Sequence, residues 1–316
     1  MKIILPGGSG QIGVLLARAL VADGQEVVVL SRRPTPAKWR VVAWDAKTLG
    51  PWAAELDGAD VVINLAGRSV NCRYNAANRR EIMESRVDST RVVGQAIGQT
   101  ARPPRLWLQA STATIYSHRY DAPNDEITGI IGSNESEAPP SWQFSIEVAT
   151  AWERAANEAV TPATRKVLLR SAMTMSPDRG GVFDALLGLV RRGLGGTSGD
   201  GRQFVSWIHD RDFIRAVQWL IEHELQGPVN LASPDPIPNA AFMRTLRSAW
   251  GTRLGLPANR WMLEVGALLM WTETELVLKS RRVVPARLVQ SGFSFDFPGW
   301  AEAAADLCSR WREQNR

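Results

Sequence analysis

Cysteine, histidine and long apolar runs are all scarce in this sequence of 316 residues. Its two cysteines, Cys72 and Cys308, lie far apart and show no metal-ligand spacing, which excludes a disulfide framework and favours reduced thiols. Three histidines are too few and too scattered for a His-rich metal site. We therefore expect a cytoplasmic protein with no bound metal.

Apolar segments of membrane-spanning length are also missing. The apolar run that begins at Ile3 stops at Pro6-Gly7-Gly8, so we expect no signal peptide. The most apolar later segment, Trp261 to Trp271, carries Glu264 and is too short to cross a bilayer. We therefore expect no membrane partner.

The net charge is mildly positive, at +5, and nearly all of the basic residues are arginine. Lysine occurs only at positions 2, 38, 47, 166 and 279. No dense basic run with interleaved aromatic residues is present, so the charge predicts an anionic small ligand and no nucleic acid.

Short apolar segments alternate with helical patterns through the first half of the chain, which predicts a Rossmann-type, doubly wound parallel α/β sheet. The expected helices are Gln11–Ala22, Ala76–Gln99 and Trp142–Val160. The expected strands are Lys2–Leu5, Glu26–Leu30, Arg40–Trp44, Asp60–Leu65, Arg105–Gln109 and Lys166–Arg170.

After Arg170 the pattern changes to a smaller, mixed C-terminal substrate subdomain. We predict a nucleotide-binding domain over residues 1–172 and the smaller subdomain over 173–316, with segments near 204–232 returning to the first sheet. Expected strands there are Gln203–Ile208 and Pro228–Leu231, and expected helices are Asn239–Trp250 and Ala301–Trp311. The polar stretch Asp121–Pro140 is expected to form a flexible loop over the site.

The sharpest motif is a glycine-rich turn between the first strand and the first helix. Gly7, Gly10 and Gly13 have the spacing G-x-x-G-x-x-G. The first glycine permits a tight turn, the second lets a pyrophosphate approach the backbone, and the third packs the helix on the strand. We predict a dinucleotide site here, with Ser9, Gln11 and Ile12 beside the glycines.

The end of the second strand predicts which dinucleotide is bound. An NAD site usually has an acidic residue here for the ribose 2′-hydroxyl, whereas this chain has Ser31, Arg32 and Arg33. A hydroxyl and guanidinium groups match a 2′-phosphate and therefore NADP, although the two arginines would also suit a solvated loop. Asp45 follows the third strand, where it would accept a hydrogen bond from the adenine amine or cap a turn.

Further motifs extend over the whole chain. Asn64-Leu65-Ala66-Gly67 ends the fourth strand, and Ser111-Thr112-Ala113-Thr114-Ile115-Tyr116 follows the fifth. With the glycine-rich turn, they resemble the extended short-chain dehydrogenase/reductase superfamily, which includes nucleotide-sugar epimerases and dehydratases. Further segments resemble an atypical NAD(P)-dependent epimerase subgroup that has its own C-terminal domain. They are Asn71 to Thr90, Trp152-Glu153, Ser206-Trp207-Ile208-His209, Gly227 to Ala232 and Ser291-Gly292-Phe293.

This resemblance implies roles for residues at the strand ends. Ala66 and Gly67, after Leu65, would lie beside the cofactor's ribose and phosphates. Ser111 would lie near the nicotinamide, and Thr112 would hold the position of the catalytic hydroxyl that binds the substrate oxygen. Ser171, Ala172 and Met173 would contact the nicotinamide from the end of the sixth strand. Turn capping is the structural alternative for Ser111 and Thr112.

The chain departs from the superfamily in its catalytic residues. The usual Tyr and Lys, four residues apart on one helix, are absent, because the three tyrosines are Tyr74, Tyr116 and Tyr120 and no Lys lies between Lys47 and Lys166. Phe144 or Ser145 takes the tyrosine position. The remaining candidates for proton transfer are Tyr116, Glu147 and water, while His209 is expected to be structural.

A second departure concerns the substrate. Where nucleotide-sugar enzymes often have Arg-Asp after a glycine-rich segment, this chain has Val205-Ser206, which argues against a nucleotide sugar. Possible anion contacts are Arg73, Arg86 and Arg202. We predict an NADP(H)-dependent oxidoreductase or epimerase acting on a small polar carbonyl or alcohol, and a homodimer is the assembly that we consider. The alternative is a non-catalytic NADP(H)-binding sensor or interaction protein.

Overall fold

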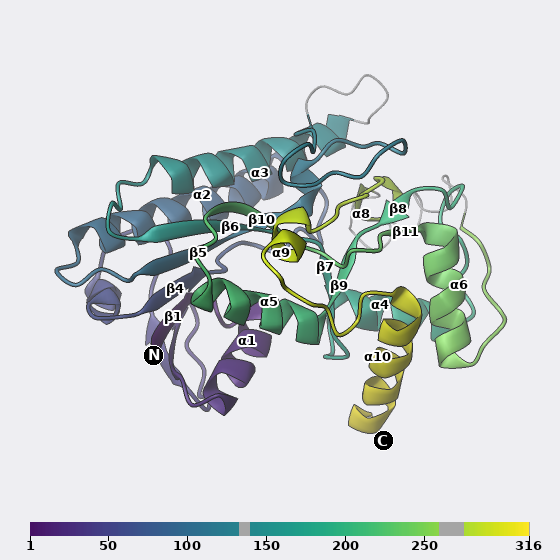
Figure 1. The fold of residues 1–316 in the computed structure, drawn as a ribbon, viewed down its shortest axis with the longest axis horizontal. Helices are drawn as coiled ribbons and strands as arrows, with labels where there is room; N and C mark the ends of the chain where they lie inside the picture. Colours follow the sequence, from purple (N-terminus) through teal and green to yellow (C-terminus); the bar gives the residue numbers. More distant parts are fainter. Residues whose placement is uncertain (133–139, 259–274, 316) are drawn as a thin grey trace.

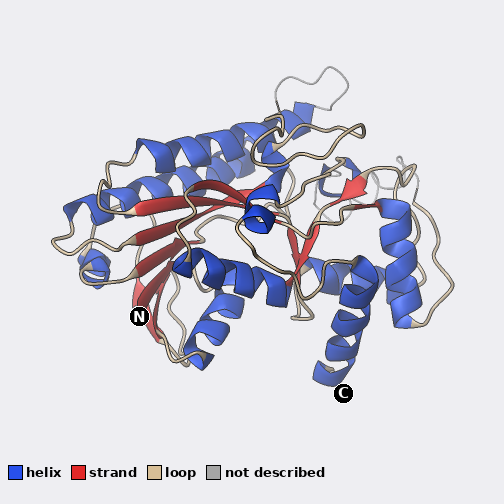
Figure 2. Cartoon of the chain, viewed as in Figure 1, coloured by secondary structure: helices blue, strands red, loops and turns tan. Residues whose placement is uncertain are grey.

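A seven-stranded parallel sheet forms the centre of the computed structural model, which describes residues 1–132, 140–258 and 275–315 (Figure 2). The strand order is β3-β2-β1-β4-β5-β6-β10, which confirms the expected doubly wound sheet. The strands are β1 (Lys2–Pro6), β2 (Glu26–Ser31), β3 (Arg40–Ala43), β4 (Val61–Asn64), β5 (Leu106–Thr112), β6 (Arg165–Ser171) and β10 (Gly227–Leu231).

Helices cover both faces of this sheet (Figure 1). One face carries α2 (Ala76–Gln99) and α3 (Pro140–Glu158), and the other carries α1 (Gln11–Ala22) and α5 (Asp210–Glu222). Successive strand residues supply the two cores, because Ile3 and Leu5 pack on the α1–α5 side while Ile4 packs on the other. Burial on both faces explains why these strands are almost wholly apolar.

The second region packs around an aromatic cluster. Phe183, Trp207, Phe242 and Trp300 are buried there between helices α4 (Val182–Arg191), α6 (Asn239–Trp250) and α10 (Trp300–Gln314). This region contains two short strand pairs: β7 (Met173–Met175) with β9 (Trp207–His209), and β8 (Phe204–Val205) with β11 (Ile237–Pro238). The remaining described elements are η1 (Pro51–Leu56), η2 (Ala113–Ile115), α8 (Glu275–Leu278) and α9 (Ala286–Gln290).

Two of the expected strands differ from the structure. Strand β5 continues to Thr112, so Ser111 and Thr112 end the strand instead of following it. The single strand expected over Gln203–Ile208 is two strands, β8 and β9, which pair with different partners. From the region near 204–232, β10 pairs with β6 as the edge strand of the first sheet, and α5 and Ile208 of β9 pack in its core.

The stretch Asp121–Pro140 is not a loose loop where the structure describes it. The backbone of Asn124 donates to the carbonyl of Arg282 and accepts from the amide of Val284, at 2.7 and 3.0 Å. These bonds hold the stretch against the C-terminal part of the chain. Residues 133–139 lie outside the described part.

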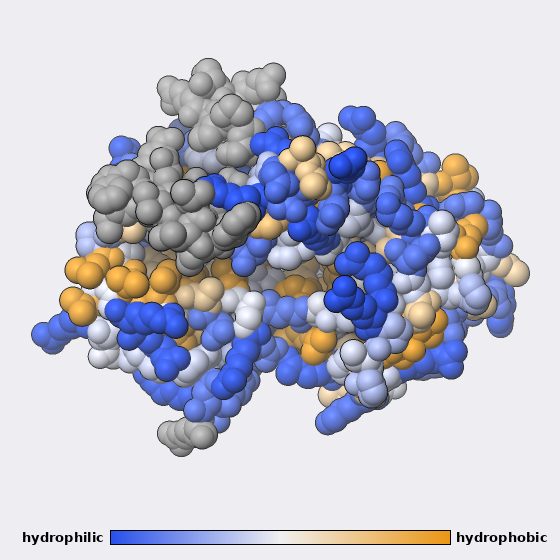
Figure 3. Space-filling view, turned by 180° about the vertical axis from the view of Figure 1, so that it is seen from behind, coloured by the Kyte–Doolittle hydropathy of each residue, from blue (hydrophilic) through white to orange (hydrophobic). Residues whose placement is uncertain are grey.

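No helix in the described ranges is long and apolar enough to cross a membrane. The segment Trp261 to Trp271 lies outside those ranges. The face seen from behind is mostly hydrophilic, with small separate apolar areas (Figure 3).

Candidate functional site

The glycine-rich turn has the geometry that a bound pyrophosphate needs. Gly7 has φ +74°, and a Cβ there would lie 2.6 Å from the Cα of Ala66. A Cβ on Gly13 would lie 2.4 Å from the Cα of Gly8, so this glycine lets α1 pack on the turn. A Cβ on Gly10 would meet only the carbonyl of Gly7, at 3.7 Å. Gly10 also caps α1 without a side-chain hydrogen bond, which leaves the first amides of the helix available to an anion.

A pocket of about 350 Å³ opens beside this turn, at the carboxyl ends of β1, β2 and β4. Eight of the predicted cofactor residues line it: Gly7, Ser9, Gly10, Ser31, Arg32, Asp45, Ala66 and Gly67. Sequence reasoning missed Lys47, which also lines the pocket and pairs with Glu84 and Asp88 at 3.6 and 3.4 Å. A ligand at the carboxyl ends of parallel strands is what an open α/β sheet predicts.

The residues expected at the 2′-phosphate divide into two groups. Ser31 is buried, and its hydroxyl donates to the Ser9 hydroxyl at 3.1 Å and accepts from the amide of Arg33 at 3.2 Å. Arg32 is exposed and lines the pocket. Arg33 is exposed outside the pocket lining, so its side chain fits the solvated alternative.

Asp45 both lines the pocket and caps its own turn. Its carboxylate accepts from the amides of Lys47 and Thr48, at 2.8 and 2.9 Å, and from the Thr48 hydroxyl at 2.5 Å. These bonds lower the pKa of Asp45 to about 2, the Thr48 hydroxyl contributing most. The capping alternative is therefore confirmed, and the contact with adenine remains a prediction.

The other predicted cofactor residues lie outside this pocket. Ile12 and Leu65 pack partly buried against the core, and Gln11 is exposed beside Gly181. Ser171, Ala172 and Met173 are half-buried at the end of β6, as expected from their order, but line neither this pocket nor the one beside Thr112.

The Ser111 hydroxyl is bonded to a buried ion pair behind the end of β5. It donates to Glu153 at 2.6 Å, and Arg170 binds the same carboxylate through two bonds of 2.8 Å. The side chain of Ser111 thus faces α3, not an open site. The carboxylate and guanidinium connect β5, α3 and β6 at the carboxyl edge of the sheet.

Thr112 lines a second, smaller pocket of about 120 Å³. Its hydroxyl is bonded to the hydroxyl and the amide of Thr114, at 3.1 and 3.2 Å. The remaining wall consists of Val70, Tyr74, Ile82, Arg86, Phe144, Ser145, Val148, Trp152 and Arg281. The expected hydroxyl is therefore present in a cavity, and one of the possible anion contacts, Arg86, faces the same cavity.

The phenol of Tyr116 has a structural role. It is buried outside the Thr112 pocket, donates to Asn230 at 3.0 Å and accepts from Arg170 at 2.9 Å. Burial raises its pKa although Arg170 opposes the shift. Tyr116 is not placed to transfer a proton at Thr112.

Glu147 does not line the Thr112 pocket, contrary to the sequence expectation. Glu147 is exposed and lines a different surface pocket with Gln143 and Thr150. Ser145 and Val148 occupy the face of α3 toward Thr112, and Glu147 lies two residues from Ser145, which on a helix is the opposite face.

The position of the missing tyrosine is taken by Phe144 and Ser145, both of which line the Thr112 pocket. The Ser145 hydroxyl donates to the buried carboxylate of Glu275 at 2.5 Å. Lys279 lies 3.8 Å from the same carboxylate and donates to the carbonyl of Thr114 at 3.1 Å. Sequence reasoning missed Glu275, Lys279 and Arg281; the one available signal was a lysine in a lysine-poor chain.

His209 is structural, as expected. It is buried, stacks on Phe297 with 3.8 Å between ring centroids, and its Nε2 lies 3.0 Å from Asp306. Burial lowers its pKa, and Asp210 and Asp306 oppose the shift. In the described ranges, no group of three or more His, Cys, Asp or Glu side chains is arranged to hold a metal ion.

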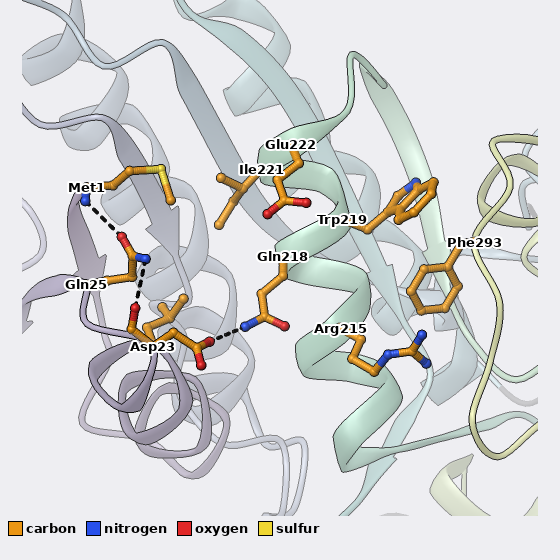
Figure 4. Close-up of a pocket in the computed structure, with 10 residues that line it drawn as sticks. Met1, Asp23, Gln25, Arg215, Gln218, Trp219, Ile221, Glu222 and Phe293 are labelled. Atoms are coloured by element: carbon orange, nitrogen blue, oxygen red, sulfur yellow. Dashed lines mark hydrogen bonds between the residues drawn. The ribbon is translucent and has the colours of Figure 1, made fainter.

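A third pocket, of about 400 Å³, lies between the C-terminal end of α1 and helix α5 (Figure 4). Gln218 bonds Asp23 across it, while Arg215 and Trp219 extend toward Phe293. It contains none of the predicted site residues.

Comparison with known proteins gives matches over nearly the whole chain. Residues 3–232 match the NAD dependent epimerase/dehydratase family, and residues 260–307 match a domain of unknown function, DUF1731. The chain is 31% identical to the epimerase family protein SDR39U1 of Bos taurus and 29% identical to that of Homo sapiens, over 97% of its length and 99% of theirs. The crystal structure of the human protein (isoform 2) with NADPH has a TM-score of 0.83 at 28% identity and covers 98% of this chain and 99% of its own.

Proposed function

The chain belongs to the NAD dependent epimerase/dehydratase family, and we propose that it binds NADPH and transfers hydride between that cofactor and a small carbonyl or alcohol. One observation carries the proposal: the glycine-turn pocket and the Thr112 pocket share a wall. Arg86 lines the Thr112 pocket and packs over Gly67, which lines the other, such that a Cβ on Gly67 would lie 3.3 Å from its Cζ. A cofactor and a substrate would therefore meet.

The residues of the first pocket fit NADPH. The open space over Gly10 and the uncapped amides of α1 suit a pyrophosphate. Arg32 supplies positive charge next to Ser31, while Lys47 lines the same pocket paired with Glu84 and Asp88. No acidic residue follows β2 where NAD enzymes usually have one. The likeness to a protein crystallised with NADPH supports the same choice.

The residues of the second pocket are suited to bind the reacting oxygen of the substrate and to transfer one proton to or from it. When bound, the cofactor supplies or accepts the hydride. Thr112 donates a hydrogen bond to the reacting oxygen, which favours the polarised carbonyl. In alcohol oxidation, Ser145 accepts the substrate's hydroxyl proton while passing its own to Glu275; in reduction the proton moves from Glu275 through Ser145 to the carbonyl oxygen.

A second candidate function is NADPH binding without turnover, as a sensor or interaction module. The observation in its favour is the absence of Tyr-x-x-x-Lys together with the bonded hydroxyl of Tyr116. The Thr112 cavity and its Ser145–Glu275 pair favour the enzyme, because a binding module needs neither.

The experiment that tests the proposal measures NADPH oxidation by the full chain against a panel of small aldehydes, ketones and oxo acids. The expected result is slow turnover of at least one compound, lost in Thr112→Val. Tight NADPH binding with no oxidation of any compound would favour the binding module. Absence of NADPH binding would overturn both functions.

A further inference from the structure

The small pocket beside Thr112 is lined by one guanidinium, that of Arg86, that has no carboxylate partner among the described residues. The lining of this pocket includes four residues with a hydroxyl, Tyr74, Thr112, Thr114 and Ser145, and two with a guanidinium group, Arg86 and Arg281. The rest of the wall is apolar or aromatic. An arginine facing a small cavity lined by apolar groups is costly unless an anion binds it, because burial penalises the charged form.

The Arg86 guanidinium is held in place by its neighbours, but no carboxylate in the described ranges neutralises its charge. Its Nη1 donates to the carbonyl of Ile82 at 3.1 Å, one turn back on α2, and its Cζ lies 5.0 Å above the ring of Trp152. Among the residues that the structure describes, no carboxylate lies within 4 Å of this guanidinium. Burial lowers the pKa of Arg86 to about 10. With one of five N–H groups engaged, the guanidinium keeps donors for a ligand.

Arg281 enters the same pocket from the C-terminal part of the chain, and its backbone is fixed. Its amide donates to the carbonyl of Phe204 at 2.8 Å, and its carbonyl accepts from the Ser206 hydroxyl at 2.5 Å. Its Nε lies 3.3 Å from the Thr114 hydroxyl, which is itself bonded to Thr112. Its Nη2 donates to the carbonyl of Glu275 at 3.3 Å, and the Glu275 carboxylate favours its charged form. The Arg281 guanidinium is thus held beside Glu275, one hydroxyl away from the group proposed to bind the reacting oxygen.

The volume limits what can occupy the pocket. About 120 Å³ corresponds to about four water molecules at their volume in the liquid. A nucleotide diphosphate does not fit that space, whereas an oxo or hydroxy acid of a few carbons does. A planar carboxylate also matches guanidinium donors better than a single point charge does.

We propose that the substrate carries a carboxylate, held by Arg86, next to the carbonyl or hydroxyl that Thr112 binds. This inference names the substrate class of the proposed function and rests on it for the chemistry. In reduction, the carbonyl carbon receives the hydride of NADPH and its oxygen receives the proton passed by Ser145, while the carboxylate is unchanged. The products are a hydroxy acid and NADP⁺.

The first test is calorimetric binding of small acids to the full chain, with and without NADP⁺. The probes are pyruvate, 2-oxobutyrate and acetoacetate, each beside its amide, which keeps the shape and removes the charge. We expect at least one acid to bind with Kd below about 10 mM and at least about tenfold tighter than its amide. Failure of all three acids, or equal binding of acid and amide, overturns the proposal.

The second test asks whether Arg86 is the group that binds the carboxylate of the acid. Arg86→Met keeps the apolar stem and should weaken binding of the acid at least about tenfold, with partial recovery in Arg86→Lys. Arg79→Met is the matched control, because Arg79 also lies on α2, donates to a backbone carbonyl and lies over an aromatic ring, 4.9 Å from Phe144, but does not line the pocket. Equal loss in both variants overturns the assignment.

NADPH affinity separates this inference from the proposed function. Arg86→Met should change the NADPH Kd by less than about threefold; a tenfold loss with unchanged acid binding would mean that Arg86 serves the cofactor's pyrophosphate and would overturn the inference alone. If the wild-type chain does not bind NADPH, the proposed function fails, and acid binding without nucleotide still decides on the carboxylate site. If Arg86→Met does not fold, the comparison of acid and amide on the wild type decides.

Discussion

Single side chains at the end of β2 and β5 decide the cofactor and the chemistry that we propose. Ser31 is buried with its hydroxyl bonded on two sides, while Arg32 is exposed at the rim of the pocket. Thr112 lines a cavity, whereas Tyr116, four residues later, has its hydroxyl bonded by Asn230 and Arg170. Residues this close in the sequence therefore have different roles.

Cofactor choice should depend on Arg32. NADPH is expected to bind at least tenfold more tightly than NADH, a difference of about 1.4 kcal/mol, because a guanidinium pairs with the 2′-phosphate. Arg32→Ala should remove most of that difference, and Arg33→Ala, outside the pocket, should not. Titration of nucleotide fluorescence measures both affinities. Equal affinity of the wild type for the two nucleotides would show that the 2′-phosphate is not recognised.

Turnover should depend on the Thr112 hydroxyl, which we propose binds the reacting oxygen of the substrate. Thr112→Val keeps the shape and removes the hydroxyl, so turnover should fall more than tenfold while NADPH affinity is nearly unchanged. Tyr116→Phe should cost less activity and mainly lower stability, because its phenol is bonded within the fold. Steady-state rates and thermal unfolding of both variants check this. The reverse order of the two activity losses would mean that the wrong hydroxyl has been assigned.

At the scale of elements, the sequence predicts best where local chemistry fixes the structure. The glycine-rich turn, α1 and the buried strands follow from glycine spacing and apolar runs, and each was found within a residue or two. The end of β5 was missed, because Ala110 to Thr112 are held in the strand by pairing with Leu169 to Ser171, which no local pattern reveals. The split between β8 and β9 likewise depends on two different partners.

Valine substitutions at two glycines of the turn should have different effects, one on nucleotide binding and one on stability. Gly10→Val should fold, because its Cβ meets only one backbone oxygen at 3.7 Å, but it should block nucleotide binding. Gly13→Val should lose about 1–3 kcal/mol of stability or more, because its Cβ would lie 2.4 Å from Gly8. Thermal unfolding with and without NADPH distinguishes them. A Gly10→Val protein that NADPH still stabilises would contradict the predicted position of the pyrophosphate.

The buried pair between α3 and β6 should hold the carboxyl edge of the sheet. Glu153→Ala leaves Arg170 buried without its carboxylate and should cost about 3–5 kcal/mol. Glu158→Ala, at an exposed position of the same helix, should stay within about 0.5 kcal/mol of the wild type. Chemical denaturation measures both. A small effect at Glu153 would mean that water or another group replaces the partner.

At the scale of the whole molecule, the Thr112 pocket and its surroundings are formed by both parts of the chain. Thr112 and Ser145 come from the sheet domain, while Glu275 and Arg281 come from beyond residue 274, brought in by bonds to Phe204 and Ser206. No sequence spacing connects residues about 160 positions apart, so the C-terminal groups could not be predicted. The glycine-turn pocket could, because its residues follow successive strands whose ends meet at one edge.

This arrangement also explains how a chain without Tyr and Lys could still transfer a proton. In the proposed proton transfer, Ser145 takes the place of the phenol, and Glu275 from the other part of the chain takes the place of the amine. A serine hydroxyl is a weaker acid than a phenol beside a lysine, so we expect turnover about 10²–10⁴-fold slower than in relatives that have the pair.

The most direct test of the account follows the hydride itself. The full chain is loaded with NADPH that carries deuterium at the transferring C4 position and is mixed with a small oxo acid, and the product is analysed by mass spectrometry. The account predicts a hydroxy acid that contains one deuterium at the former carbonyl carbon, formed in step with NADP⁺ and lost in Thr112→Val. Oxo acid recovered unchanged and unlabelled from a protein shown to bind both NADPH and the acid would contradict it.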